Sequence, residues 1–167
     1  MSIVRIRIIG LGGQGIVFSG WLLSHAASLK NLYSSVYNSY GAEVRGGSVS
    51  THVTISDKPI ESPYTDTFDI DVLLHKVGWS KVSHAKLVIA DDTLAKNGKK
   101  ELNIEWLPFH IISVKEKLPI NITVLGYLVK KIDFLDLDAL VDAVKSRGIN
   151  VEKNIMALKV GFELNPT

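Results

Sequence analysis

The run Ile9-Gly10-Leu11-Gly12-Gly13-Gln14-Gly15 constrains the fold more than any other part of the sequence. The residues before it, Ile3 to Ile9, are rich in β-branched side chains and alternate with arginine, which is typical of a strand. Residues 16–30 after it are mostly apolar and contain no proline, as expected of a helix. This order places the first N–H groups of the helix at the carboxyl end of the strand. Such a point favours an anion, and glycines allow a phosphate or another backbone to approach closely.

The spacing Gly10-x-Gly12-x-x-Gly15 also fits the dinucleotide-binding fingerprint, which needs the same strand and helix. A nicotinamide or flavin site further requires an acidic residue about 20 positions on, at the end of the second strand. The second strand is predicted at Ser35–Asn38 and is followed by uncharged residues, while the nearest acid, Glu43, lies in another glycine segment. Three interpretations of the turn therefore stay open: tight strand–helix packing, an NAD or flavin site, and a site for another anionic ligand.

The composition limits the partners and the chemistry that the chain can have. With 167 residues, 46% of them hydrophobic and 22% charged, it is expected to fold as one ordinary globular domain. A net charge of +2 gives no basis for nucleic acid as the main partner. There is no cysteine, so the chain itself can hold no iron–sulfur cluster and offers no thiol nucleophile. No run of about 18 apolar residues and no signal peptide are found, so we expect no membrane span and a cytoplasmic location.

Periodicity predicts three further strands and then three helices: 48–55, 70–75 and 86–90, followed by 119–132, 136–144 and 151–164. Ile155, Leu158 and Phe162 are the predicted core stripe of the last helix. Segment 106–114 is interrupted by Pro108 and is predicted to contribute only short strand. The sequence therefore predicts a single-domain α/β fold with a mostly parallel sheet, flanking helices and a helical C-terminal end.

The sequence shows none of the common catalytic motifs. Its five histidines lack the paired spacing of a zinc helix, and no Gly-x-Ser-x-Gly elbow is present. The glycine turn lacks the Lys-Ser/Thr of a nucleotide-hydrolysing loop. Acidic pairs stand near two strand ends, Asp69 with Asp71 and Asp91 with Asp92, where they are expected to cap helices or face water rather than bind metal. We therefore predict no catalytic and no metal-ligating residue, and alone the chain is expected to be a binding or assembly unit.

A second glycine segment, Tyr40-Gly41-Ala42-Glu43-Val44-Arg45-Gly46-Gly47, combines an acid, an arginine and three glycines. Its glycines permit backbone bends that place Arg45 near the carboxyl ends of the strands. A guanidinium there can bind an anion through two parallel hydrogen bonds. Equally, Arg45 can pair with Glu43 or an aspartate and hold the loop or a subunit contact. The residues alone leave both roles open.

Three ordered motifs resemble the gamma subunit of 2-oxoacid:ferredoxin oxidoreductases. They are the Gly-x-Gly-Gly-Gln-Gly turn after the first strand, the Tyr-Gly-x-Glu-x-Arg-Gly-Gly loop, and Ile55-Ser56-Asp57-x-Pro59-Ile60-x-Ser62-Pro63. The pattern continues through residues 69–74 and Asn121, so it covers nearly the whole chain. The family includes enzymes for pyruvate, 2-oxoglutarate, branched-chain 2-oxoacids and indolepyruvate. By this resemblance, residues 1–167 form one gamma-type catalytic domain with an α/β fold.

The resemblance implies a hetero-oligomer that converts a 2-oxoacid and coenzyme A into acyl-CoA, carbon dioxide and reduced ferredoxin. Thiamine diphosphate and magnesium would lie between alpha and beta subunits, and iron–sulfur clusters on partners that include a ferredoxin-like delta subunit. This chain would contain no complete active site and would assist assembly and coenzyme A binding. The phosphates of coenzyme A would suit Gly12, Gly13, Gln14, Gly15 and Arg45. The alternative is a freestanding NAD- or flavin-binding oxidoreductase domain, and neither reading predicts which 2-oxoacid is used.

Overall fold

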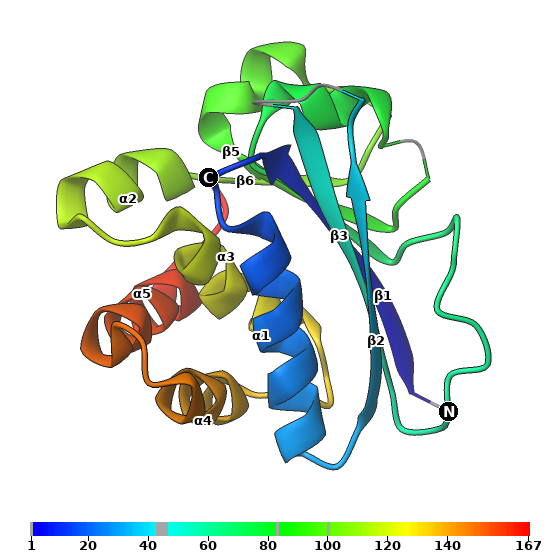
Figure 1. Cartoon of the computed structure of the whole chain (residues 1–167). Coiled ribbons are helices and arrows are strands. Elements are labelled where there is room, and N and C mark those ends of the chain that lie inside the picture. The colour runs from blue at the N-terminus through cyan, green and yellow to red at the C-terminus, as the bar shows by residue number, and fades with distance from the viewer. Residues whose placement is uncertain (1, 43–46, 83, 100) are drawn as a thin grey trace.

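The computed structural model describes residues 2–42, 47–82, 84–99 and 101–167. Within these ranges, six strands, five α-helices and three short 3₁₀ helices (η1–η3) follow one another (Figure 1). Their bounds are β1 Ile3–Leu11, α1 Ile16–Leu29, β2 Tyr33–Tyr40, β3 Ser48–Ser56, β4 Ile70–Leu73, η1 Lys76–Ser80, β5 Leu87–Asp91, η2 Asp92–Asn97, β6 Ile104–Leu107, α2 Phe109–Glu116, α3 Ile120–Leu128, η3 Val129–Lys131, α4 Leu137–Arg147 and α5 Val151–Glu163.

The six strands form one sheet in the order β2-β3-β1-β4-β5-β6. β1, β4, β5 and β6 are parallel, while β3 runs antiparallel to both of its neighbours, β1 and β2. The mostly parallel sheet is therefore confirmed, with β3 as its one reversed strand. Only residues 41–47 separate β2 from β3, too few for the crossover that a parallel pair requires. The two strands consequently pair as neighbours that run in opposite directions.

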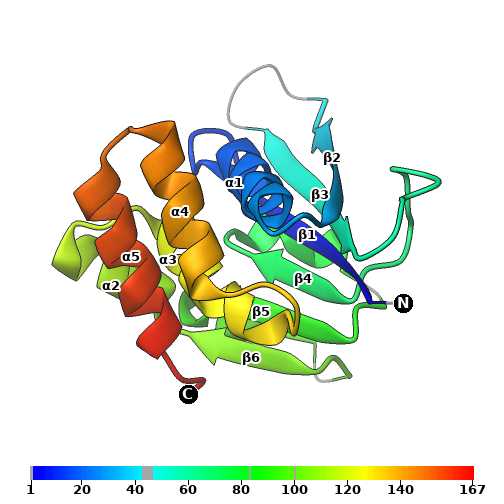
Figure 2. The ribbon, with the colours of Figure 1, turned by 90° about the horizontal axis from the view of Figure 1, so that it is seen from below.

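All five α-helices lie on one face of the sheet (Figures 1 and 2). Alternate residues of β1, namely Val4, Ile6 and Ile8, are buried against this helix layer. Within the layer, α3 is the innermost helix, because every one of its residues from Asn121 to Leu128 is buried. Because it is buried on all sides, α3 is the centre of the helical half of the core. Burial of its apolar surface stabilises the fold by about 25 cal/mol per Å².

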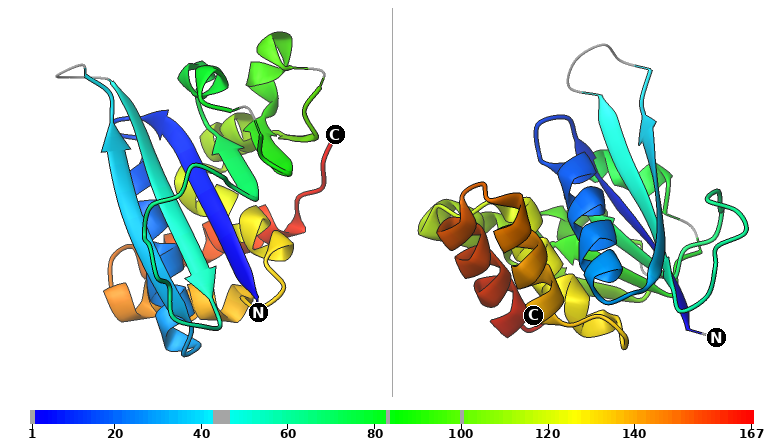
Figure 3. Two further views of the ribbon diagram at one scale, coloured as in Figure 1. Left: turned by 90° about the vertical axis from the view of Figure 1, so that its right-hand side faces the viewer. Right: turned by 60° about the horizontal axis from the view of Figure 1, so that its bottom comes forward.

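The other face of the sheet carries a smaller apolar cluster and one crossing segment. Residues 57–69 pass over β1 and β3 on this face (Figure 3, left). From this segment, Phe68 packs edge-on against His52 and Tyr64 packs edge-on against Tyr37. The cluster beside them, under η1 and η2, consists of Ile9, Leu73, Trp79, Val82, Val88 and Ala90.

Two details of the predicted fold are wrong. Segment 106–114 is not strand throughout: β6 ends at Leu107 and α2 begins at Phe109, with Pro108 as its N-cap. The N-terminal turn of α2 is held by a remote acceptor, since the backbone N–H of His110 donates to the Asp91 carboxylate at 2.6 Å. In α5, Phe162 is 39% exposed and is not part of the core. The other two predicted positions are confirmed, since Leu158 is buried and Ile155 is partly buried against the core, and Asn154, Ala157 and Gly161 complete the buried side of α5.

Candidate functional site at the glycine corner

The turn between β1 and α1 runs from Gly12 to Gly15 and requires glycine at two of its positions. Gly13 and Gly15 have positive φ angles of 90° and 75°, which side-chain-bearing residues rarely adopt. A Cβ atom at Gly15 would also collide with the side-chain amide of Asn121, whereas Gly12 and Gly13 face open space. The corner is therefore tightly packed on the side of α3 and open on the side of Gly12.

The open side presents backbone donors. The helical hydrogen bonding of α1 begins with Ser19 N–H donating to Gly15 C=O at 3.0 Å, so the N–H groups of Ile16, Val17 and Phe18 precede it. Gly15 is the N-cap; no side chain of the described residues caps α1, and the first turn of the helix contains no acid. Uncapped donors and the positive end of the helix dipole together favour a negatively charged group at this point.

A cleft of about 410 Å³ opens at these donors. Gly12, Gly13 and Gly15 form one side of it. Its apolar walls come from the end of β1, from α1, from the end of β2 and from the start of β3: Leu11, Ile16, Val17, Phe18, Tyr40 and Val49. A ligand with an anionic centre and an apolar arm matches such a cleft.

Of the predicted site residues, Gln14 does not line this cleft. The Gln14 side chain turns inward, where its Oε1 accepts from Leu11 N–H at 2.7 Å and its Nε2 donates to Leu74 C=O at 3.4 Å. Gln14 thus ties the turn to the end of β4, and its contact with a ligand stays a prediction. Arg45 lies outside the described residues, so its place relative to the turn also stays a prediction.

Asn121 is a site residue that the sequence did not single out on its own. It lies in the first turn of α3, is 8% exposed, and donates from Nδ2 to Gly15 C=O at 3.2 Å. This bond fixes the start of α3 to the start of α1. The sequence signal for Asn121 is weak, because an asparagine shortly after Pro119 at a helix start is common and its partner is 106 residues away.

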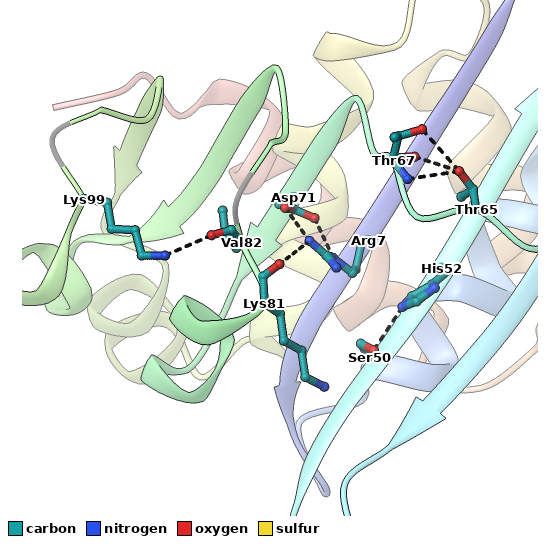
Figure 4. A network of polar contacts seen from close by, with 9 residues as sticks. All are labelled: Arg7, Ser50, His52, Thr65, Thr67, Asp71, Lys81, Val82 and Lys99. Carbon is teal, nitrogen blue, oxygen red and sulfur yellow. Dashed lines mark hydrogen bonds and ion pairs between the residues drawn. The ribbon is translucent and has the colours of Figure 1, made fainter.

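Polar side chains of β1, β3 and β4 gather on the sheet face opposite the helices (Figure 4). The Arg7 guanidinium donates to both Asp71 carboxylate oxygens at 2.8 Å and to Lys81 C=O at 2.9 Å. It also lies 4.3 Å from the centre of the Phe68 ring. Burial raises the pKa of Asp71, while the hydrogen bonds and charge of Arg7 oppose this shift. The expectation that Asp71 caps a helix or faces water is therefore wrong, whereas Asp91 does cap η2 by accepting from Thr93 N–H.

His52 lies beside this pair in β3, and its stability contribution is expected to depend on pH. Burial, together with the positive charges of Arg7 and Lys81, lowers the pKa of His52 to about 4 from the ordinary value of 6.5. The unfolded chain therefore binds more protons than the folded one between these two values, so the stability is complete above pH 6.5 and is lost as the pH falls towards 4. Allowing for solvent around this half-buried ring, we expect a loss of about 1 kcal/mol between pH 7.5 and pH 5.

The measurement is urea unfolding of the wild type and of His52→Gln at the two pH values. Glutamine does not titrate and can keep the contact that His52 Nε2 makes with Ser50 Oγ at 3.1 Å. We expect the variant to show a pH dependence smaller by this amount. Equal pH dependence in both proteins would contradict the assignment.

The fold and the corner define an α/β domain that offers a phosphate-compatible turn and, having no cysteine, no ligands for an iron–sulfur cluster. Among the described residues there is also no cluster of three or more histidine, aspartate or glutamate side chains that could hold a metal ion. Nor is any helix in the described ranges long and apolar enough to cross a membrane.

Comparisons with known proteins identify the family. The family described as "Pyruvate ferredoxin/flavodoxin oxidoreductase" matches residues 5–164. The chain is 34% identical over 174 residues to the 2-oxoglutarate synthase subunit KorC of Methanocaldococcus jannaschii, covering 96% of this chain and 92% of KorC. It is 30% identical to the ketoisovalerate oxidoreductase subunit VorA of Methanothermobacter thermautotrophicus, over 96% of this chain and 36% of VorA.

A solved structure agrees with these relatives. The gamma subunit of a keto/oxoacid ferredoxin oxidoreductase from Geobacter sulfurreducens superposes with a TM-score of 0.76 at 26% identity, covering 98% of this chain and 96% of that one. The chain therefore belongs to the pyruvate ferredoxin/flavodoxin oxidoreductase family, as a gamma subunit of a 2-oxoacid:ferredoxin oxidoreductase. The family resemblance of the three sequence motifs is confirmed, and the alternative of a freestanding NAD- or flavin-binding oxidoreductase is not favoured.

Proposed function

We propose that this gamma subunit holds coenzyme A at the glycine corner and helps to assemble a thiamine-diphosphate-dependent enzyme that decarboxylates a 2-oxoacid oxidatively to acyl-CoA. The observation that carries the proposal is the row of uncapped N–H groups at Ile16 to Phe18, which opens into an apolar cleft of about 410 Å³. Coenzyme A combines a pyrophosphate with a flexible pantetheine arm. The pyrophosphate suits the donors, and the arm suits walls such as Val17 and Tyr40.

Other subunits supply the redox chemistry in this proposal. With no cysteine in the sequence, the iron–sulfur clusters belong on partners, including a ferredoxin-like delta subunit that passes electrons to ferredoxin. Thiamine diphosphate and magnesium belong between alpha and beta subunits, with the assembly in the cytoplasm. Residues 1–167 then act as one gamma-type domain whose own groups bind and orient the acyl acceptor. Gly12, Gly13, Gly15 and Arg45 are proposed to contact its phosphates, and Gln14 to hold the turn.

Coenzyme A binding is tested with Gly12→Ala. Gly12 has no positive φ, and a Cβ there meets no atom within 4 Å, so alanine is expected to leave stability unchanged. The added methyl group projects towards the open side of the corner and keeps phosphates from the N–H groups. Loss of one charge-assisted hydrogen bond corresponds to about a tenfold weaker Kd for coenzyme A.

The measurement is isothermal titration calorimetry of the full chain and of the complete enzyme with coenzyme A, NAD and FAD. We expect saturable coenzyme A binding that Gly12→Ala weakens, with thermal unfolding of the two proteins alike. Tight binding of NAD instead would favour the oxidoreductase alternative. Coenzyme A affinity that is the same in both proteins would overturn the proposal and leave the corner a packing device.

A further inference from the structure

β2 is the outermost strand of the sheet, and its outer edge has no partner strand among the described residues (Figure 3). With eight residues, Tyr33–Tyr40, it is longer than the usual strand of about five or six. Proteins usually protect a long edge with a lysine, a proline or a bulge. β2 contains no charged residue and no proline, and its register with β3 runs without a bulge. This edge is therefore open to pairing with another strand.

The pairing of β2 with β3 shows which backbone groups point outwards. Gly41, directly after β2, donates from its N–H to the C=O of Ser48, the first residue of β3, at 2.7 Å. Because hydrogen-bonded positions alternate along an antiparallel pair, every second residue from Tyr33 to Ser39 also bonds to β3. The N–H and C=O groups of the other four residues therefore face the open edge: Ser34, Val36, Asn38 and Tyr40.

One register between two copies of β2 gives a partner to all of these groups. When the copies run antiparallel about a two-fold axis at Tyr37, Ser34 of one copy pairs with Tyr40 of the other, and Val36 pairs with Asn38. Each of these pairs occurs twice and exchanges two hydrogen bonds, so about eight bonds join the copies. A typical protein interface contains about ten direct hydrogen bonds. An axis at Val36 would leave Tyr40 unpaired, so the register centred on Tyr37 is favoured.

The side chains at this edge are compatible with a second copy. On the sheet face opposite the helices, the two Tyr37 rings, each 40% exposed in the single chain, meet across the axis as a cross-strand aromatic pair. On the helix face, α1 packs beside β2, with Ser24 Oγ 2.7 Å from Ser34 Oγ. α1 contains no aspartate, glutamate, lysine or arginine, and its exposed side includes Val17 and Trp21. Neither β2 nor α1 therefore brings like charges together.

We infer that β2 is a dimerisation edge, through which two copies of this gamma subunit join their six-stranded sheets into one. The edge fits a second copy because it is complementary to itself: one symmetric register uses all its outward groups, and it carries no charge that would select an oppositely charged chain. The inference goes beyond the proposed function, since it does not depend on coenzyme A.

Cross-linking tests the register, because the chain has no cysteine of its own. In Tyr37→Cys the two thiols face each other at a non-hydrogen-bonded position, where Cα atoms about 4.5 Å apart permit a disulfide. In the matched control Tyr33→Cys, on the same face of β2, the two thiols are eight residues apart along the strands, or roughly 27 Å. After mild oxidation of the full chain, we expect a disulfide-linked dimer from Tyr37→Cys and none from Tyr33→Cys.

Val36→Pro tests the hydrogen bonding of the edge. Val36 N–H points away from β3, so proline leaves the pairing of β2 with β3 intact and removes one donor from each copy. Analytical ultracentrifugation of the full chain is expected to show a dimer for the wild type and a dissociation constant raised by about tenfold or more for Val36→Pro. Val36→Thr keeps the N–H and is expected to dimerise like the wild type. Thermal unfolding of the dilute, monomeric proteins checks that the variants fold.

A wild type that stays monomeric at every concentration would overturn the inference, and so would equal cross-linking of Tyr37→Cys and Tyr33→Cys or equal dimerisation of Val36→Pro and Val36→Thr. The same cross-linking is carried out on the complete enzyme. If Tyr37→Cys there links to a different subunit instead of a second gamma subunit, another chain occupies the edge and the inference is wrong. None of these results bears on coenzyme A binding, which Gly12→Ala tests separately.

Discussion

Asp71→Ala is expected to lower the free energy of unfolding by about 3–5 kcal/mol, because it leaves the Arg7 guanidinium charged and unpaired in a nearly dry site. The Asp71 side chain is fully buried and that of Arg7 is 14% exposed. Of its partners among the described residues, Arg7 would keep the Lys81 carbonyl and the Phe68 ring. Denaturant unfolding at pH 7.5 measures the change.

Two further variants separate the buried pair from the general loss of a carboxylate. Asp69→Ala removes a partly exposed acid that pairs with the exposed Lys86 and accepts from Arg5 N–H, so a loss of only about 1–2 kcal/mol is expected. The double variant Arg7→Met/Asp71→Leu removes both charges and is expected to recover most of the stability. A loss for Asp71→Ala no larger than for Asp69→Ala would contradict the structural role of the pair.

The parts of the fold that the sequence predicted are those specified by neighbouring residues. The first strand, the glycine turn and the first helix follow one another without interruption, so each supports the prediction of the next. The fourth helix is equally local: Asp136 accepts from Ala139 N–H at 2.8 Å at its start, and Gly148 ends it with a φ of 72°. These interactions span three or four residues, and a single sequence contains all of them.

The parts that were missed depend on pairings across the chain. Alternation identified β3 as a strand, but its place between β1 and β2 follows from register, with Arg7 opposite His52 in β1 and Tyr37 opposite the same residue in β2. Asp71 looked like a capping residue because its partner, Arg7, is 64 positions earlier. In the same way α2 begins directly after a proline, and the acceptor for its first turn, Asp91, lies in β5.

In the candidate site, too, the parts formed by neighbouring residues were predicted and the parts formed by distant residues were not. The glycine corner was predicted because its strand, turn and helix are contiguous. The contact that closes this corner was not, because Asn121 lies in α3 and donates to Gly15 at the start of α1, 106 positions away. A contact of this kind has no sequence spacing of its own, and Asn121 looks like an ordinary helix position until the fold brings it to Gly15.

The crossing of α3 and α5 is the place where one added methyl group is expected to lower the free energy of unfolding most. At this crossing Gly126 of α3 and Gly161 of α5 let the two backbones touch. A Cβ atom on Gly161 would collide with the backbone of Thr123, and one on Gly126 with the backbone of Leu158. Backbone atoms inside helices cannot turn aside as a flexible side chain can, so the two helices would have to separate.

Gly161→Ala is therefore expected to lower the free energy of unfolding by about 3 kcal/mol, since separation opens space around the fully buried Leu158. Gly126→Ala is expected to act similarly, and the double variant less than additively, because one separation relieves both collisions. Gly12→Ala is the matched control: it makes the same chemical change where nothing lies within 4 Å. Denaturant unfolding of the four variants measures these differences. Equal stability of Gly161→Ala and Gly12→Ala would show that α3 and α5 do not meet backbone to backbone.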